Sequence, residues 1–246
     1  MDSSRKHFQS SSSGQNGEPK KRVALFGGSF NPPHEGHFTM LEHITHSLGV
    51  DSIWMMFSQN RFKDADSYAS IEQRMEMATL LKDHYPDLSV ELSDIEEQLG
   101  THITADILKH LANAHPDIEF IWVMGGDNLV EFHLWQDYEY IMDHFEICVV
   151  NRPGYEDEAL GSVVATNYAA LKKEPQETLA GGKRGWSFIE TTGTDMSSSG
   201  LMEQIHAGQR YFDGPFQDVA DYIYRNGLYG VKPELAPDKP KMFKPK

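Results

Sequence analysis

The sequence predicts an α/β protein with a doubly wound (Rossmann-like), mostly parallel sheet in a single domain. Three observations support this class. Short apolar runs alternate with segments of helical periodicity along the chain. A chain of 246 residues, of which 39% are hydrophobic, can bury one sizeable core. A glycine turn follows the first apolar run, at the place where such sheets bind ligands.

The expected elements alternate between strand and helix. Apolar runs of this kind predict strands because parallel strands are buried on both faces. Right-handed crossovers between them would place a ligand site at the carboxyl ends of the strands. A polar region of about thirty residues separates the last two expected strands. The strands are expected over 23–26, 52–57, 89–92, 119–124, 145–150 and 187–190, and the helices over 35–48, 71–82, 104–114, 138–142, 199–207 and 216–226.

Both ends of the sequence differ in composition from its middle. Residues 1–21 are rich in Ser, Gly, Gln and Lys and contain almost no aliphatic side chains. They are expected to form a disordered leader, because too little apolar surface is available to offset the entropy of ordering. Residues 231–246 are rich in Pro and Lys and are expected to form a flexible tail. The expected domain covers residues 22–230.

Charge and cysteine content exclude several classes of protein. The net charge of -15 argues against nucleic acid or an acidic membrane surface as a main partner. A phosphate site must therefore be local. The single cysteine, Cys148, lies in an apolar run and is expected to be a buried structural thiol in a reducing compartment. Because neither a signal-peptide core nor a membrane-length apolar stretch is found, we expect a cytoplasmic protein.

The segment from Arg22 to His37 carries the clearest chemical signal. It passes from an apolar run through Gly27 and Gly28 to two prolines and two histidines. The glycines permit backbone angles, or a close approach of a ligand, that a side chain would prevent. A helix is expected to begin near Glu35, so its unpaired main-chain amides would point to the same place. Anions are favoured there, which indicates a nucleotide triphosphate site.

His34 and His37 are three residues apart. If the helix begins here, both side chains lie on one face of its first turn and can contact neighbouring phosphates. Gly36 between them leaves room for a ribose or a base. Nucleotidyl transfer depends on hydrogen-bond donors around the reacting phosphorus, which imidazoles can supply. The same spacing also fits a surface pair or a helix cap, but the preceding strand, glycines and prolines favour the phosphate site.

This segment resembles the G-x-F-x-P-x-H-x-G-H signature of the nucleotidylyltransferase superfamily. Further segments similar to bacterial nicotinate-nucleotide adenylyltransferases follow in the expected order, at 100–106, 124–135, 151–155 and 196–199. The resemblance covers about residues 22–229. It implies transfer of AMP from ATP to nicotinate mononucleotide, with release of pyrophosphate. Every fixed position of the signature is matched, by Gly28, Phe30, Pro32, His34, Gly36 and His37.

The resemblance also implies roles for individual residues. His37 would donate to the α-phosphate of ATP and His34 to the β- and γ-phosphates. Mg2+ would arrive with the nucleotide and neutralise charge, so no metal ligand from the protein is expected. The serines of 197–199 would complete the anion cradle. The candidate ATP-binding residues are Gly27, Gly28, Ser29, Phe30, Gly36, Gly125, Asp127, Ser197 and Ser198.

Gly125 and Asp127 come directly after the fourth expected strand. A glycine there can bring main-chain amides close to a ligand, while the carboxylate accepts hydrogen bonds from a sugar or base. In the resembling family the corresponding residues help to hold the adenosine part of the nucleotide. An ordinary Gly-Asp turn remains the alternative.

The acceptor nucleotide is expected to contact a second group of residues. Trp135 offers a flat apolar face for a pyridine ring, although a large aromatic can also be core. The family binds the pyridine carboxylate at a helix N-terminus, where this chain has Thr104. His102 and Ile103 depart from the residues more usual in the family, which leaves the choice between nicotinate and nicotinamide open. The candidates for this nucleotide are Asn60, Lys63, Thr104, Trp135 and Arg152.

The segment 196–202 departs from the family pattern. The family has an arginine one turn after the serines, and this chain has Met202 there. The loss of a hydrogen bond to a charged group costs about 1.5 to 3 kcal/mol. Lys63 or Arg184 could replace the missing cation. The serines could also serve only as a helix cap.

Other functions remain as alternatives. The acceptor could be nicotinamide mononucleotide or phosphopantetheine, and Met202 motivates a non-catalytic nucleotide-binding protein. Arg74 is either an ion-pair partner of Glu72 or Asp94 or a ligand contact. A dinucleotide-dependent oxidoreductase is disfavoured because the glycine turn lacks the G-x-G-x-x-G order, and a zinc hydrolase because the H-E-x-x-H frame is missing. The oligomeric state, a homo-oligomer included, stays open.

Overall fold

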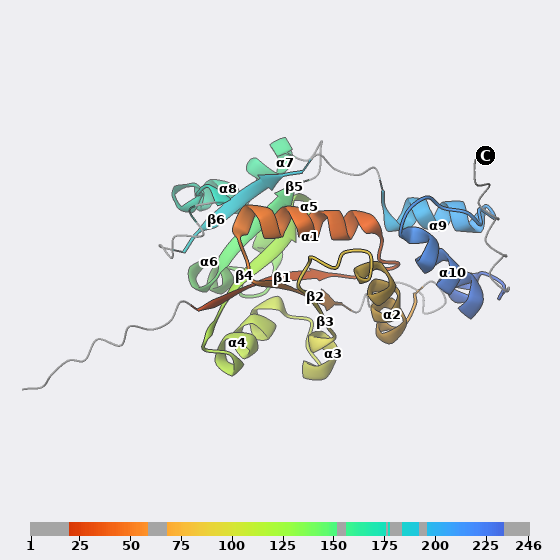
Figure 1. Ribbon diagram of the computed structural model, residues 1–246. Helices are drawn as coiled ribbons and strands as arrows, with labels where there is room; N and C mark the ends of the chain where they lie inside the picture. The colour runs from red at the N-terminus through yellow and green to blue at the C-terminus, as the bar shows by residue number, and fades with distance from the viewer. Residues whose placement is uncertain are drawn as a thin grey trace, which may run out of the picture.

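The computed structural model describes residues 20–58, 68–151, 156–175, 177, 184–191 and 196–233. Within these residues the strands form one parallel sheet in the order β3-β2-β1-β4-β5-β6 (Figure 1). This is the strand order of the doubly wound nucleotide-binding fold, which confirms the predicted fold class. The predicted leader and tail lie almost entirely outside the described residues. The strands are β1 (Lys21–Gly28), β2 (Ser52–Phe57), β3 (Val90–Ser93), β4 (Ile118–Gly125), β5 (Glu146–Asn151) and β6 (Trp186–Glu190).

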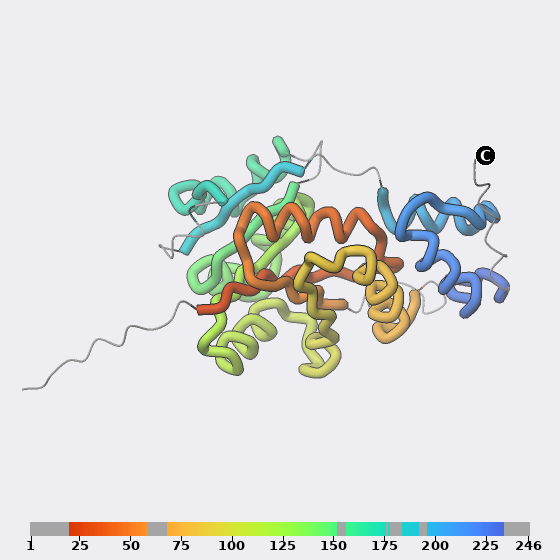
Figure 2. Tube along the Cα trace, viewed as in Figure 1, coloured from red at the N-terminus to blue at the C-terminus, as the bar shows by residue number. Residues whose placement is uncertain are grey.

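Helices cover both faces of this sheet. Side chains of β1 alternate between the two faces, so that Ala24 and Phe26 enter one core cluster and Val23 and Leu25 the other. Figure 2 follows the chain through this arrangement and shows the last two long helices beyond one end of the sheet. The first face is covered by α1 (Glu35–Leu48) and α2 (Ile71–Lys82), and side chains of α9 (Ser198–His206) and α10 (Phe216–Asn226) extend the same core cluster; the second face is covered by α3 (Ile95–Leu99), α4 (Thr104–Ala114), α5 (Gly126–Glu131), α6 (Tyr138–His144), α7 (Glu156–Leu160) and α8 (Val163–Asn167).

Local signals explain the ends of the longer helices. In α2, the Ser70 hydroxyl accepts the Gln73 N–H at 3.2 Å and the Gln73 side chain accepts the Ser70 N–H at 3.0 Å. This reciprocal capping box satisfies two amides that the helix leaves unpaired. Helices α1 and α10 end at Gly49 and Gly227, whose φ values are 54° and 63°. A glycine adopts this left-handed conformation without steric cost.

Several short elements depart from the sequence prediction. The polar region before the last strand, where no helix was predicted, contains α7, α8 and the 3-10 helix Ala169–Leu171. The connections after β3 and β4 contain α3, α5 and the 3-10 helix Phe132–Leu134. Helices of three to six residues are too short to show a periodic pattern, and tertiary packing stabilises them rather than propensity.

Cys148 lies in the middle of β5 and is fully buried. Burial raises the pKa of its thiol to about 12, although the side chain of Ser187 acts in the opposite direction. The prediction of a buried structural thiol is confirmed. No helix in the described part of the chain has the length and apolar character needed to cross a membrane.

Candidate active site

The glycine turn closes β1 at the carboxyl edge of the sheet. Gly27 and Gly28 pair with Met56 and Phe57 of the neighbouring strand β2. A Cβ atom on Gly27 would lie 2.9 Å from the ring of Trp122, and one on Gly28 would lie 2.8 Å from the ring of Phe30. Both contacts are too short for a real side chain. Glycine is therefore required here by packing.

The two histidines meet at the start of α1. His34 has extended backbone angles and caps the helix, and His37 lies in its first turn. Their ring centroids are 3.7 Å apart, and the His34 N–H donates to His37 Nδ1 at 3.1 Å. Because Nδ1 accepts this hydrogen bond, the neutral His37 imidazole carries its proton on Nε2. The pair is arranged so that His37 can donate through Nε2.

The buried side chain of Phe30 packs against the histidine pair. Its ring lies 5.0 Å from that of His37, edge to face, and 5.1 Å from that of Phe57. The side chain is 3% exposed. Phe30 also has a φ of 43°, which is uncommon for a residue with a side chain. The side chain of Phe30, a residue expected to bind ATP, packs against the ring of His37.

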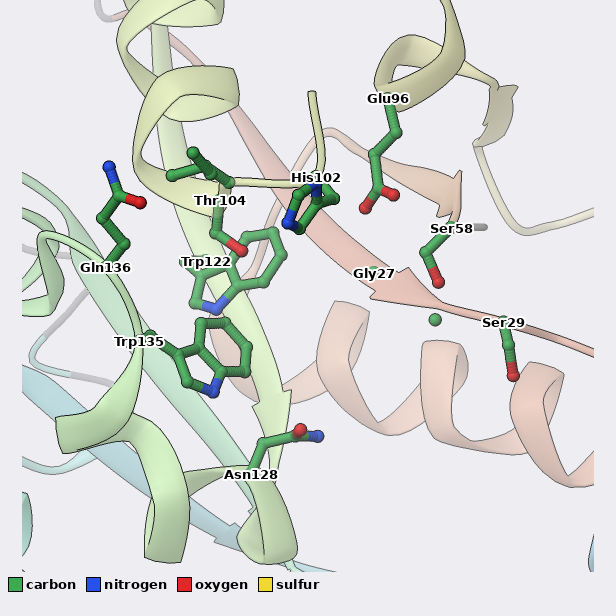
Figure 3. Close-up of a pocket in the computed structure, with 12 residues that line it drawn as sticks. Gly27, Ser29, Ser58, Glu96, His102, Thr104, Trp122, Asn128, Trp135 and Gln136 are labelled. Atoms are coloured by element: carbon green, nitrogen blue, oxygen red, sulfur yellow. The ribbon is translucent and has the colours of Figure 1, made fainter. Parts of the chain in front are cut away.

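A cavity of about 540 Å³ opens at this edge of the sheet (Figure 3). Its wall is formed by residues at the ends of β1 and β2, by β4, by α3 and the start of α4, and by α5 and the segment that follows it. Five of the predicted site residues, Gly27, Gly28, Ser29, Thr104 and Trp135, line it. His102 and Ile103, which the sequence placed next to Thr104 in the acceptor segment, also line it, and the lining residues that were not predicted are Ser58, Glu96, Trp122, Asn128 and Gln136.

Two tryptophans give the cavity an aromatic side. Trp122 on β4 and Trp135 have ring centroids 6.4 Å apart and ring planes inclined at 71°. Phe132 packs edge to face behind Trp135, with centroids 5.2 Å apart. Thr104, at the start of α4, lines the same cavity as the two tryptophans (Figure 3). A flat apolar ring with a polar substituent fits such a surface.

His34, His37, Ser197 and Ser198 are not among the residues that line this cavity. Ser197 caps α9 by accepting the Gly200 N–H at 3.1 Å. The Ser198 hydroxyl donates to the carbonyl oxygen of Pro32 at 2.8 Å and so joins α9 to the loop that precedes His34. Ser197 borders a second cavity of about 460 Å³, together with Glu35. The structure thus brings the serines to the histidine loop rather than into the first cavity.

Other predicted residues fall in several places. Gly125 ends β4, and Asp127, which is exposed, lies in the first turn of α5. A Cβ atom on Gly125 would lie 2.3 Å from Asp127 Oδ1, so these two residues are in contact. Gly36 lies in the first turn of α1 between the histidines. Asn60, Lys63 and Arg152 lie outside the described residues.

Neither candidate replacement for the missing family arginine can be placed at the site. Met202 packs against the core cluster beneath α9. Arg184 precedes β6 and donates to the carbonyl oxygen of Asp143 at 3.4 Å. Because a residue before a parallel strand lies at the amino edge of the sheet, Arg184 is at the wrong edge for the site, and its predicted role is corrected. Lys63 lies outside the described residues.

Arg74 has a different role from those expected. It is 2% exposed, and its guanidinium donates to the carbonyl oxygens of Ser29, Ser58 and Ala69. The contact with Ser58 measures 2.9 Å. Arg74 thereby ties together the residues that follow β1 and β2, two of which line the cavity. Desolvation by burial lowers its pKa, but an arginine remains charged under any ordinary condition.

Comparison of the sequence with known proteins shows the family of this chain. The cytidylyltransferase-like family matches residues 25–204. A protein of Rhizobium meliloti (strain 1021), named "Probable nicotinate-nucleotide adenylyltransferase", is 36% identical over 183 residues, which cover 73% of this chain and 96% of that protein. A protein of Brucella suis biovar 1 (strain 1330) with the same name is 34% identical over 183 residues, covering 73% and 93%.

A solved structure supports the fold independently. The structure of Plasmodium falciparum nicotinic acid mononucleotide adenylyltransferase complexed with NaAD aligns with a TM-score of 0.62 at 20% identity. The alignment covers 87% of this chain and 100% of that chain. At this identity the likeness concerns the fold alone, whereas the sequence relatives identify the family. The chain therefore belongs to the cytidylyltransferase-like family and, within it, to the nicotinate-nucleotide adenylyltransferases.

Proposed function

We propose that the protein transfers the adenylyl group of ATP to nicotinate mononucleotide, forming the deamido dinucleotide and pyrophosphate. A phosphate oxygen of the acceptor attacks the α-phosphorus, and the bond from that phosphorus to the bridging oxygen of the leaving pyrophosphate breaks. The observation that carries this proposal is the His34–His37 pair beside a glycine turn that opens on an aromatic cavity. Family membership supports the same reaction.

In this proposal the protein positions the reactants and stabilises charge. His37 donates through Nε2 to the α-phosphate, and His34 faces the β- and γ-phosphates. Fixed donors of this kind stabilise the charge that develops in the transition state. The serines at the start of α9 hold the loop and complete the cradle for the phosphates. Trp135 and Trp122 contact the pyridine ring, and Thr104 contacts its carboxylate.

We propose that Mg2+ accompanies the nucleotide at this site. Among the described residues no group of three or more His, Cys, Asp and Glu side chains could hold a metal ion. Mg2+ commonly binds through phosphate oxygens and water with few protein ligands. When bound to ATP it would neutralise phosphate charge. We further propose that residues 22–230 act as one domain and that the reaction takes place in the cytoplasm.

A parallel assay of acceptors tests the proposed function. The protein is supplied with ATP and Mg2+ and with nicotinate mononucleotide, nicotinamide mononucleotide or phosphopantetheine, and pyrophosphate release is measured. We expect nicotinate mononucleotide to give the highest kcat/KM. Release with another acceptor alone would show that the acceptor is wrong. ATP binding in a calorimeter without turnover would favour a non-catalytic protein, the alternative that Met202 motivates.

Substitution of Trp135 by leucine should weaken binding of the acceptor. Loss of an aromatic stacking partner is worth about 0.5 to 1.5 kcal/mol, so the KM for the acceptor should rise up to about tenfold. The KM for ATP should stay within about twofold of the wild-type value. Trp54→Leu is the matched control, because Trp54 packs against His115 and Phe120 away from the cavity. Equal effects of the two substitutions on the acceptor KM would refute the role of Trp135.

A further inference from the structure

Residues from other parts of the chain fix the loop between β1 and α1 through hydrogen bonds to Asn31. The Asn31 side-chain oxygen accepts the hydroxyl of Tyr229 at 2.9 Å and the N–H of Ala69 at 3.2 Å. Tyr229 is separated from Asn31 by 198 positions in the sequence. Ser198 reaches the next residue of the loop, Pro32. The loop that leads to the histidines is thus fixed by side chains from distant parts of the chain.

Tyr229 lies in the 3-10 helix Leu228–Gly230, directly after α10. Its φ of 56° is in the left-handed region, which residues with side chains rarely adopt. Phe30, next to Asn31 in the loop, has a φ of 43°. Unfavourable backbone conformations persist where the surrounding structure imposes them, and they cluster at functional sites. Here Phe30 is the neighbour of Asn31 in the chain, and Tyr229 is the residue that donates a hydrogen bond to Asn31.

The hydroxyl of Tyr229 is a fixed donor. The residue is 8% exposed, and burial raises the pKa of its phenol well above the ordinary range. The hydroxyl therefore keeps its proton at any pH at which the enzyme works. Since Asn31 cannot ionise, the orientation of this hydrogen bond does not change with pH.

The anchored loop leads directly to the histidines. His34 is three positions after Asn31, and both residues between them are prolines. The His34 N–H donates to His37 Nδ1 and so orients the His37 ring. Proline fixes φ, so a displacement at Asn31 is transmitted to His34 with little local relaxation. Misplacement of a catalytic group by about 1 Å can lower a rate by about 100-fold.

We propose that Tyr229 is a positioning residue, whose hydrogen bond to Asn31 holds the histidine pair in its productive orientation. This inference rests on the proposed function of that pair. Tyr229 itself contacts neither cavity, so it acts through the loop. The C-terminal helical segment is thereby coupled to the reaction.

The substitution Tyr229→Phe tests this proposal because it removes only the hydroxyl. We expect kcat to fall about tenfold, with the KM values for ATP and the acceptor within about twofold. Tyr224→Phe is the matched control. Tyr224 is 2% exposed and donates to the carbonyl oxygens of Ile205 and Gln209. Its kcat should stay within about twofold of wild type.

A double-mutant cycle separates positioning from general destabilisation. Asn31→Ala removes the acceptor of the same hydrogen bond. If Tyr229 acts through Asn31, the double variant should have the kcat of the more impaired single variant. Measurements are made well below the melting temperature of every variant. Multiplied losses in kcat, or equal losses in the two tyrosine variants, would overturn the proposal.

A spectroscopic measurement decides the proposal without reference to turnover. The ¹⁵N resonances of the His34 and His37 imidazoles report ring environment and tautomer. They should shift in Tyr229→Phe and remain in place in Tyr224→Phe. Unchanged resonances in Tyr229→Phe would overturn the positioning role. A wild-type protein inactive with every acceptor would refute the proposed function, while the resonances would still decide whether Tyr229 holds the pair.

Discussion

Substitution of His37 by asparagine is expected to lower kcat by about 100- to 1000-fold, the usual effect of removing one fixed donor to a developing oxyanion. The asparagine oxygen lies near the position of Nδ1 and can still accept the His34 N–H, a contact of 3.1 Å in the wild type. The group lost is the donor at Nε2. Because the capping interaction is kept, the protein should remain folded. The measurements are pyrophosphate release and circular dichroism.

Two companion variants sharpen this test. His37→Gln places an amide nitrogen near the position of Nε2 and should recover part of the lost rate. His46→Asn, in the last turn of the same helix, replaces an exposed imidazole and should keep the wild-type kcat. An asparagine at position 37 with wild-type kcat would contradict the donor role of Nε2. A glutamine variant slower than the asparagine variant would contradict it as well.

The fold was predictable because its signals are local. The expected bounds of the long helices agree with the structure nearly to the residue, and the capping serine and C-terminal glycines that end them also act within a few residues. The histidine pair was predictable for the same reason, since a helix start brings residues three apart together. Sequence spacing can therefore predict a pair of site residues that lie within one turn of a single helix.

Contacts between distant segments could not be predicted in this way. Trp122 lies in an apolar run and was counted only as part of a strand. Its place in the cavity depends on the register that pairs it with Leu25 and on the missing side chain of Gly27. The glycine interpreted as space for a ligand is also space for the edge of this indole. The register between β1 and β4 determines which side chain lies next to Gly27, and a single sequence does not reveal that register.

Assignments of the serines illustrate a further limit. Their residue type predicted both a helix cap and a phosphate cradle, and the structure assigns Ser197 to the cap and Ser198 to the histidine loop. A hydroxyl can donate and accept at once, so these bonds are compatible with phosphate binding. Asn60, Lys63 and Arg152, outside the described residues, stay predictions.

Substitution of Arg74 by methionine should destabilise the protein by about 3 kcal/mol. The change leaves the carbonyl oxygens of Ser29, Ser58 and Ala69 without their charged donor, and each buried unpaired group costs about 1 to 3 kcal/mol. We expect less than the full sum because Ser29 and Ser58 line the cavity, where water can reach them. Methionine fills much of the vacated space, so the cavity term stays small.

Thermal unfolding measures this loss of stability, and a control variant shows how much stability is lost when an exposed arginine is replaced. A loss of about 3 kcal/mol corresponds to a decrease in Tm of about 6 to 12 °C for a chain of this size. Arg225→Met is the control, because Arg225 is exposed on α10 and its loss should cost about 0.5 kcal/mol or less. Arg74→Lys should fall between the two, since one compact ammonium cannot reproduce the fork that spans two strand ends. Equal Tm values for the two methionine variants would show that the strand ends hold together without Arg74, and the cavity wall would then depend on the sheet register alone.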